Sequence, residues 1–201
     1  MSKQTSTIGD RVVLSTIAGM IFECLPESEA SNFSSQFELA VTVCSGVDIS
    51  LIWSKLALWL LIDSTYGVIR YNLQGAEAIE QVTELFKQLN RGTKLLAQEW
   101  ILAAEEARIV AVADANSDSK TYAKFKAAIC ASLAAETMID TKRQEDLQKF
   151  CADGVGHSST LFAAIEAAFE AGGEEWASQV TIATRNKFFQ LIWNAIHGVK
   201  E

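Results

Sequence analysis

The chain has 201 residues, a formal net charge of −8 at pH 7 and 49% hydrophobic residues. This length and this apolar fraction predict one globular domain, or one domain with an elaboration, and exclude an intrinsically disordered chain. The excess of 25 acidic over 17 basic side chains argues against a broad basic surface for nucleic acid, because negative charge repels phosphates. The composition by itself indicates no function.

The cysteines and histidines form no metal-binding pattern. The four cysteines include no CxxC pair, and the two histidines belong to no HExxH or ExxH motif. Neighbouring carboxylates at residues 105–106, 145–146 and 174–175 point about 100° apart on a helix, so they cannot jointly bind a substrate. We therefore expect buried, reduced cysteines, no metal, no cofactor and no enzymatic activity.

Two helices are predicted near the N-terminus. Asp10 can cap the first one, which extends through the apolar residues 12–22 and ends before Pro26, the only proline. Basic residues precede this apolar run, as in a secretory signal, but no small-residue cleavage site follows it, so we expect a helix. Ser35 and Glu38 have the spacing of a capping box for the second helix.

Residues 48–71 show neither helical nor strand periodicity. Apolar side chains cover every face of this segment, which fits either a fully buried helix or buried strands. Its most apolar part, residues 51–62, includes Lys55 and is too short to span a bilayer. We expect no membrane partner for the chain.

Amphipathic patterns return after this segment. Apolar residues recur at intervals of three and four between residues 79 and 89, and they predict a helix that ends near Gly92. Thr93 is expected to cap a further helix that extends to the polar cluster at residues 116–119. Residues 122–133 predict another helix.

The last third of the chain predicts three shorter helices. Two positions are expected to begin helices: Thr141, which forms a capping box with Gln144, and Ser158 or Ser159. Glycines are expected to end helices or separate them, namely Gly154, Gly172, Gly173 and Gly198. The glycine-rich residues 154–160 precede a helix N-terminus, where backbone N–H groups can bind phosphate. Because this segment lacks the lysine of a P-loop, we expect a helix-capping loop, with anion binding and catalysis as alternatives. The patterns together predict an all-α fold.

One segment resembles a known family. Residues 63–72 read Asp-Ser-Thr-Tyr-Gly-Val-Ile-Arg-Tyr-Asn, and Phe86 and Asn90-Arg91 follow at fixed spacing. This pattern is similar to the middle of the coat proteins of rod-shaped plant viruses of the tobacco mosaic type (tobamoviruses and virgaviruses), in which such a run leads into a helix that ends in Asn-Arg. Weaker matches keep the same order: Leu14-Ser15, Asn32-Phe33 and Trp53. The resemblance covers about residues 10–92.

The resemblance implies an antiparallel four-helix bundle, which can include a small β element around residues 56–71 and carries extra C-terminal helices. The coat-like bundle would comprise residues 1–155, and residues 156–201 would form a helical extension packed on the same domain. The implied function is that of a virion coat subunit that self-assembles into a helical rod around single-stranded RNA. Its partners would be further copies of itself and the RNA, in the virion and in the host cytoplasm.

The resemblance also implies RNA-binding residues just past the helix that ends in Asn-Arg. Asn90 and Arg91 match this motif. The family has a further arginine just before it, and this chain has Leu89 at that position. Lys94, one turn after Arg91, and Arg108 are the further candidates. Crowded carboxylates at subunit boundaries would make assembly favour lower pH, and three glutamates are candidates for them: Glu99, Glu105 and Glu106. The alternatives are a helix C-terminal cation for Arg91 and a solvated helix face for the glutamates.

An acidic subunit is compatible with such a rod. Many copies pack along one RNA, so each subunit needs to neutralise only a few phosphates. The sequence leaves two other classes of protein open. One is an acidic α-helical module that binds a protein partner, of the inhibitor or immunity type, by covering a basic face. The other is an enzyme or a carrier of an apolar ligand.

Overall fold

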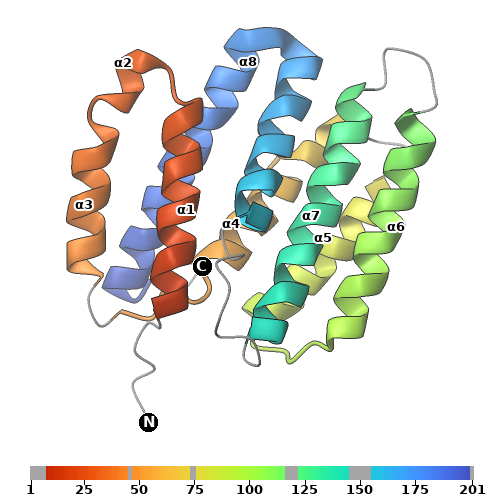
Figure 1. Cartoon of the computed structure of the whole chain (residues 1–201), viewed down its shortest axis with the longest axis horizontal. Helices are drawn as coiled ribbons and strands as arrows, with labels where there is room; N and C mark the ends of the chain where they lie inside the picture. The colour runs from red at the N-terminus through yellow and green to blue at the C-terminus, as the bar shows by residue number, and fades with distance from the viewer. Residues whose placement is uncertain (1–7, 45–46, 73–75, 116–121, 145–154, 200–201) are drawn as a thin grey trace.

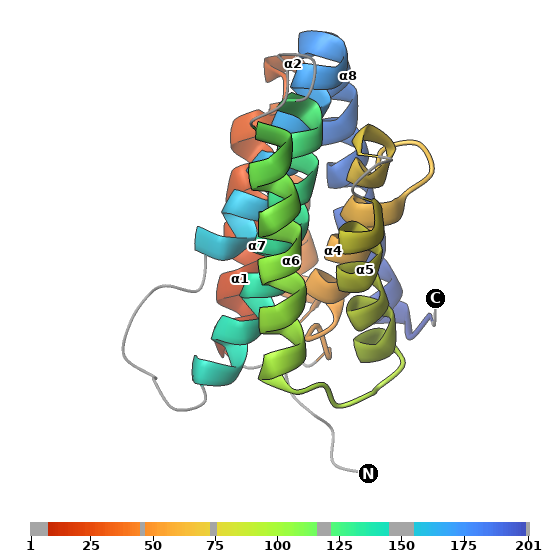
Figure 2. The ribbon, with the colours of Figure 1, turned by 90° about the vertical axis from the view of Figure 1, so that its right-hand side faces the viewer.

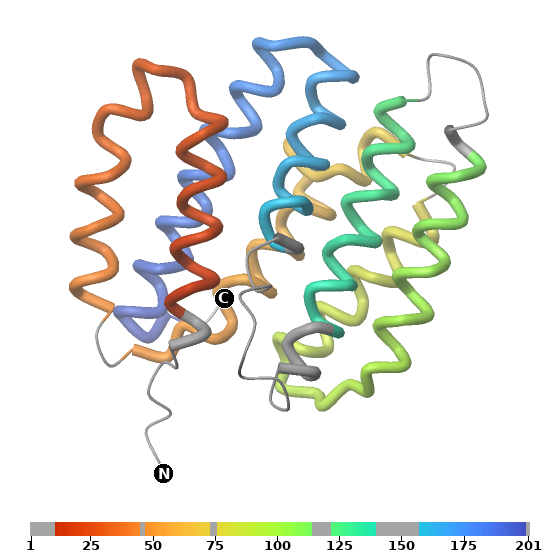
Figure 3. Tube along the Cα trace, viewed as in Figure 1, coloured from red at the N-terminus to blue at the C-terminus, as the bar shows by residue number. Residues whose placement is uncertain are grey.

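The computed structural model describes residues 8–44, 47–72, 76–115, 122–144 and 155–199 (Figures 1 and 3). The regular elements in these ranges are all helices, in the order α1 (Ile8–Cys24), α2 (Glu27–Ala30), α3 (Phe33–Val43), α4 (Ile52–Ile62), the 3-10 helix η1 (Val68–Tyr71), α5 (Ala76–Asn90), α6 (Ala97–Ala115), α7 (Tyr122–Gln144) and α8 (Val155–His197). The prediction of an all-α fold is confirmed. None of the described helices is both long and apolar enough to cross a membrane.

The helices form two layers (Figures 1 and 2). One layer contains α1, the first half of α8, α7 and α6, and the other contains the second half of α8, α4 and α5. α6 packs along α7, α7 packs along α8, and α8 also contacts α1 and α4. The domain boundary at residue 155 stays a prediction, since residues 145–154 lie outside the described ranges.

α8 belongs to both layers because it bends at Gly173 (Figure 3). This residue has φ +76° and ψ −170°, a backbone conformation that residues with a Cβ atom rarely adopt. The predicted break at Gly172 and Gly173 is therefore confirmed. The predicted end of the last helix is also confirmed, because Gly198 follows α8 with φ +65° and Val199 N–H donates to the Asn194 carbonyl oxygen.

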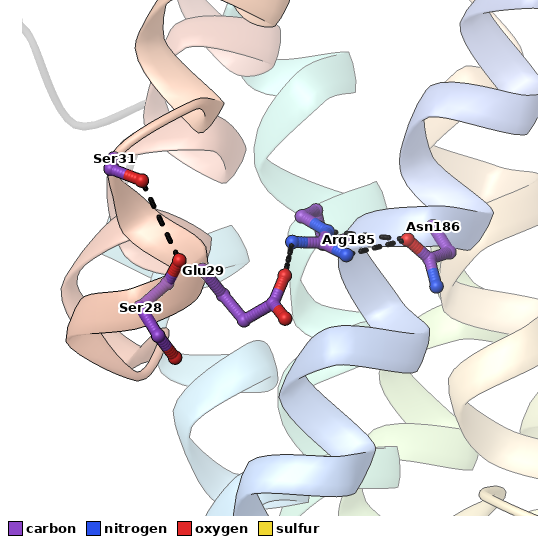
Figure 4. Close-up of polar contacts among 5 residues, drawn as sticks. All are labelled: Ser28, Glu29, Ser31, Arg185 and Asn186. Carbon is purple, nitrogen blue, oxygen red and sulfur yellow. Dashed lines mark hydrogen bonds and ion pairs between the residues drawn. The ribbon is translucent and has the colours of Figure 1, made fainter.

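Two ion pairs hold α8 against other helices. Arg185 of α8 points toward Glu29 of α2, with Nη1 2.6 Å from Oε2 (Figure 4). Lys126 of α7 lies 2.6 Å from Glu166 of α8, between Nζ and Oε2. Burial lowers the pKa of Lys126, but the hydrogen bond and the charge of Glu166 raise it, and the net shift is upward. The C-terminal helix is thus fixed to both an early and a late element of the chain.

α5 has the predicted amphipathic pattern. Ile79, Val82 and Phe86 are fully buried, whereas the glutamates of this helix are exposed. Phe86 packs edge-on against Trp100 of α6, with ring centroids 4.9 Å apart. These side chains join the two layers in one core.

Gly92 ends α5 as predicted. It has φ +85°, Gly92 N–H donates to the Leu89 carbonyl oxygen over 2.9 Å, and Thr93 N–H donates to the Gln88 carbonyl oxygen over 3.0 Å. These two bonds form a Schellman motif, in which a glycine in the left-handed region lets the last carbonyl groups find donors.

Residues 56–71 contain no strand, so the option of a β element there is wrong. α4 and η1 account for most of this segment. α4 contacts α5, η1, α8 and α7, and its buried residues include Trp53, Leu56, Ala57 and Leu61. A helix that is surrounded by other elements needs apolar residues on most of its faces, which removes the amphipathic periodicity.

Most of the predicted helix starts are wrong. The capping candidates lie inside helices rather than before them: Asp10 in α1, Ser35 with Glu38 in α3, Thr141 with Gln144 in α7, and Ser158 and Ser159 in α8. α6 begins at Ala97, so Thr93 does not cap it. Capping motifs are short-range signals, whereas packing against neighbouring helices provides most of the stability that decides how far a helix extends.

The buried side chain of Trp53 depends on Thr137 of α7 for a hydrogen bond. Trp53 Nε1 donates to Thr137 Oγ1 over 2.8 Å, and both residues are buried. Changing Thr137 to valine removes this acceptor and leaves the indole N–H unpaired, so we expect the free energy of unfolding to fall by about 2 kcal/mol. Urea unfolding measures the change. Thr181→Val is the matched control, since the buried Thr181 hydroxyl donates to Ala177 within its own helix; an equal loss in both variants would contradict the role of the Trp53 bond.

Candidate functional site

The connection between α5 and α6 carries two exposed cations. Arg91 and Lys94 both lie in it, and within the described ranges neither side chain forms an ion pair. Arg91 N–H donates to the Lys87 carbonyl oxygen over 3.1 Å, so the end of α5 fixes the position of its backbone. Both predicted residues therefore lie in the same short connection, and both side chains are exposed to solvent.

Asn90 has a partner within the chain. Its Oδ1 accepts a hydrogen bond of 2.6 Å from the hydroxyl of Ser54, a buried residue of α4. This bond ties the last turn of α5 to α4. The side-chain oxygen of Asn90 is thus engaged in the fold, in contrast to the exposed cations that follow it.

Arg108 lies apart from the α5–α6 connection. It is exposed on α6, eleven residues after Ala97, the first residue of that helix. At 1.5 Å per residue this places it about 16 Å farther along the axis. The structure does not bring Arg108 together with Arg91 and Lys94.

Glu99 has a local role at the start of α6. One of its carboxylate oxygens accepts a hydrogen bond of 2.6 Å from Leu96 N–H, the residue just before the helix. A glutamate at the third helical position commonly satisfies the backbone N–H before a helix in this way. This bond accounts for Glu99 without any second subunit.

Glu105 and Glu106 lie on an exposed face of α6. They are exposed, and so are three apolar side chains of the same helix, Leu102 (56% exposed), Ile109 (69%) and Val112 (56%). These spacings put the five residues, which we call the α6 outer face, on one side of the helix. α6 lies at one edge of the molecule (Figure 1). Clusters of exposed apolar side chains are typical of contact surfaces. The helical spacing of these three residues is visible in the sequence, so this face could have been predicted from it.

In residues 63–72, which carry part of the family resemblance, several polar groups have partners within the chain. Asp63 Oδ1 accepts hydrogen bonds from Thr65 N–H (2.9 Å) and Tyr66 N–H (2.8 Å). Gly67 N–H donates to the Asp63 carbonyl oxygen over 2.9 Å. Asn72 is fully buried and donates to the Lys124 carbonyl oxygen of α7 over 3.4 Å. These residues therefore have a structural explanation in this fold.

A cluster of aromatic residues joins this turn to the bend of α8. Trp176 Nε1 donates to the Tyr71 hydroxyl over 2.7 Å, and Tyr66 stacks on the Trp176 ring with centroids 5.7 Å apart. The Arg70 guanidinium carbon lies 5.8 Å from the centroid of the same ring. Burial raises the pKa of Tyr71, although the bond from Trp176 and the charge of Arg70 oppose the shift. The sequence gives no signal for this contact between segments that lie far apart along the chain.

The glycine-rich segment contributes residues to the core. α8 begins at Val155, Thr160 is fully buried, and His157 is 4% exposed with its ring 4.5 Å from that of Trp53. Gly154 lies outside the described residues. The buried positions of His157 and Thr160 support a structural role for this segment.

The cysteines that the structure describes are free thiols, namely Cys24, Cys44 and Cys130. Burial raises the pKa of Cys130 to about 12, so it stays a protonated thiol and a poor nucleophile at neutral pH. Within the described ranges, no group of three or more histidine, cysteine, aspartate or glutamate side chains could hold a metal ion.

The candidate surface features that involve the predicted site residues are the exposed cations of the α5–α6 connection and the α6 outer face. Comparison with known proteins finds no matching family model, no matching curated protein and no matching solved structure.

Proposed function

We propose that the chain is a structural coat subunit that self-assembles into a helical rod around single-stranded RNA, with an antiparallel four-helix bundle as its core. The proposal rests on the family resemblance of residues 63–72, Phe86 and Asn90-Arg91. The structural observation that carries it is the pair of exposed, unpaired cations at Arg91 and Lys94, within the part of the chain that is described.

The charge balance of the molecule is compatible with this role. Binding to single-stranded RNA depends on the few cations that contact phosphates rather than on the net charge of −8. Arg91 supplies a planar fork of N–H donors that suits a phosphate, and Lys94 supplies a second charge close by in the chain. Repetition along the strand makes a small contact per subunit sufficient.

The α6 outer face supports contact between copies. Its apolar residues can be buried against another subunit, and Glu105 and Glu106 would then approach other carboxylates or lose water. Both effects favour the protonated form of a carboxyl group in the assembled state. Assembly therefore takes up protons and becomes more favourable as pH falls.

Electron microscopy of the purified protein tests the proposal. We expect discs or rods at mildly acidic pH and fewer of them at neutral pH, because protonation removes the repulsion between carboxylates. Added single-stranded RNA should promote assembly at neutral pH, since its phosphates contact the cations of the α5–α6 connection. Monomers alone under every condition, with and without RNA, would rule the proposal out.

A second candidate is an acidic module that binds a protein partner. The α6 outer face favours it as well, because it combines exposed apolar residues with two carboxylates that form no ion pair in the described residues. Such a face complements a basic surface with an apolar centre. Size-exclusion chromatography separates the candidates: a one-to-one complex with a basic protein and no self-association would select the module.

A further inference from the structure

The bend of α8 depends on two adjacent glycines. Gly173 has φ +76° and ψ −170°, which interrupt the helical angles of α8. A Cβ atom at Gly172 would lie 2.7 Å from the Cβ atom of Trp176. In a straight helix, residues four apart have Cβ atoms about 5–6 Å from each other. Alanine at either position therefore fits a straight helix better than the bent one.

The second half of α8, residues 174–197, packs on helices from the start of the chain. Its Phe189 ring lies 5.4 Å from the ring of Phe33 in α3, between centroids. Its Arg185 pairs with Glu29 of α2 over 2.6 Å (Figure 4). This half also contributes several buried apolar side chains, namely Val180, Phe188, Leu191 and Ile192. It covers an apolar surface of the molecule that would otherwise be exposed.

The first half of α8, residues 155–172, has other partners. Its Glu166 forms the ion pair with Lys126 of α7. Because the two halves contact different helices, the second half can leave its place while the first half keeps its own contacts. The hydrogen bond from Trp176 Nε1 to the Tyr71 hydroxyl, over 2.7 Å, lies just past the bend and holds the closed form together.

The bend lies at one end of the molecule (Figures 1 and 2). A straight continuation of the first half would therefore extend away from its own chain. A straight α8 of 43 residues would be about 64 Å long. The surface that the second half leaves behind already fits one segment in shape and charge, which is this same half of another copy.

We propose that two copies of the chain exchange the second half of α8. In the exchanged dimer α8 straightens at Gly173, and residues 174–197 dock on α2 and α3 of the other copy. Each copy regains the contacts that it gave up, so the monomer and the exchanged dimer differ mainly at the bend. The exchange uses neither the α5–α6 cations nor the α6 outer face, so it is independent of both proposed functions.

Refolding from urea at neutral pH without RNA, followed by size-exclusion chromatography with light scattering, tests the proposal. We expect the unchanged protein to form a dimer fraction that rises with its concentration during refolding. Gly172→Ala/Gly173→Ala should form at least about tenfold more dimer relative to monomer, since each change to alanine favours a helical residue by about fivefold. Gly19→Ala is the matched control: its Cβ atom would meet nothing within 4 Å, and it should leave the dimer fraction unchanged.

A charge reversal across the exchanged contact distinguishes this dimer from any other association. One chain carries Arg185→Glu and the other Glu29→Arg, so each alone places like charges against each other. In a mixed exchanged dimer, the two reversed charges meet, and the original Arg185 meets the original Glu29 of the other chain. After refolding a one-to-one mixture, we expect at least about fivefold more mixed dimer than either homodimer, because like charges in contact are strongly unfavourable.

An affinity tag on one chain and mass spectrometry of the dimer peak measure this preference. Circular dichroism spectra establish that each variant is folded. A random distribution of the two chains, or a double glycine variant that refolds with no more dimer than the Gly19 control, would overturn the proposal. Association through the α6 outer face would give such a random distribution, because that face does not include the reversed charges.

Discussion

Replacing Arg91 with alanine is expected to abolish RNA-dependent assembly while leaving the fold intact. The Arg91 side chain is exposed, and its backbone N–H keeps the bond to the Lys87 carbonyl oxygen in the variant. Surface substitutions of this kind usually change the free energy of unfolding by less than about 0.5 kcal/mol. If Arg91 contacts one phosphate, the slope of log affinity against log salt should become shallower by about 0.7 for single-stranded RNA.

Fluorescence anisotropy with a labelled single-stranded RNA at several salt concentrations measures this slope, and electron microscopy scores assembly. Arg11→Ala is the matched control, because it removes the same charge from another exposed arginine, on α1. Adding Lys94→Ala to Arg91→Ala should reduce RNA binding further. Unchanged RNA packaging by Arg91→Ala, or an equal loss in the Arg11 control, would count against the assigned role.

Replacing Gly67 with alanine is expected to have the largest effect on stability. A Cβ atom built at Gly67 would lie 2.4 Å from the backbone nitrogen and 2.6 Å from the carbonyl oxygen of Asp63. These are backbone atoms of the turn that Asp63 itself organises through hydrogen bonds to Thr65 and Tyr66, so they cannot move without disrupting it. We expect the free energy of unfolding to fall by about 3 kcal/mol.

Urea unfolding measures this loss, and Gly19→Ala provides the control. Gly19 lies inside α1, and a Cβ atom there would have nothing within 4 Å. Alanine is a better helix former than glycine, so this variant should gain about 0.5–1 kcal/mol. Opposite signs for the two substitutions are expected; a stable Gly67→Ala protein would show that the turn does not require the close approach.

Short-range patterns predicted much of the helical framework. The apolar spacing of α5 gave its buried face correctly, including Ile79, Val82 and Phe86. The glycines that end helices were also found, because Gly92 and Gly173 adopt backbone conformations that other residues rarely adopt. Helix starts were predicted poorly, since a serine or threonine with capping spacing also occurs inside helices.

The candidate sites could be predicted only in part. The positions of Arg91 and Lys94 just past a helix end followed from the sequence, since they depend on the residues that end α5. The partner of Asn90 could not be predicted. Asn90 meets Ser54 of α4 because α4 packs against α5, and this packing joins segments that are far apart in the chain.

The sequence by itself determined that the chain is helical, where several helices end and which face of α5 is buried. Periodicity and glycine conformations carry this information, since both act over a few neighbouring residues. Only the tertiary structure decided that α4 is a helix enclosed by other helices and that Trp176 meets Tyr71. It also decided that the α6 outer face stays exposed in the described chain. These features depend on which helices pack together, and contacts between distant segments leave no local pattern in the sequence.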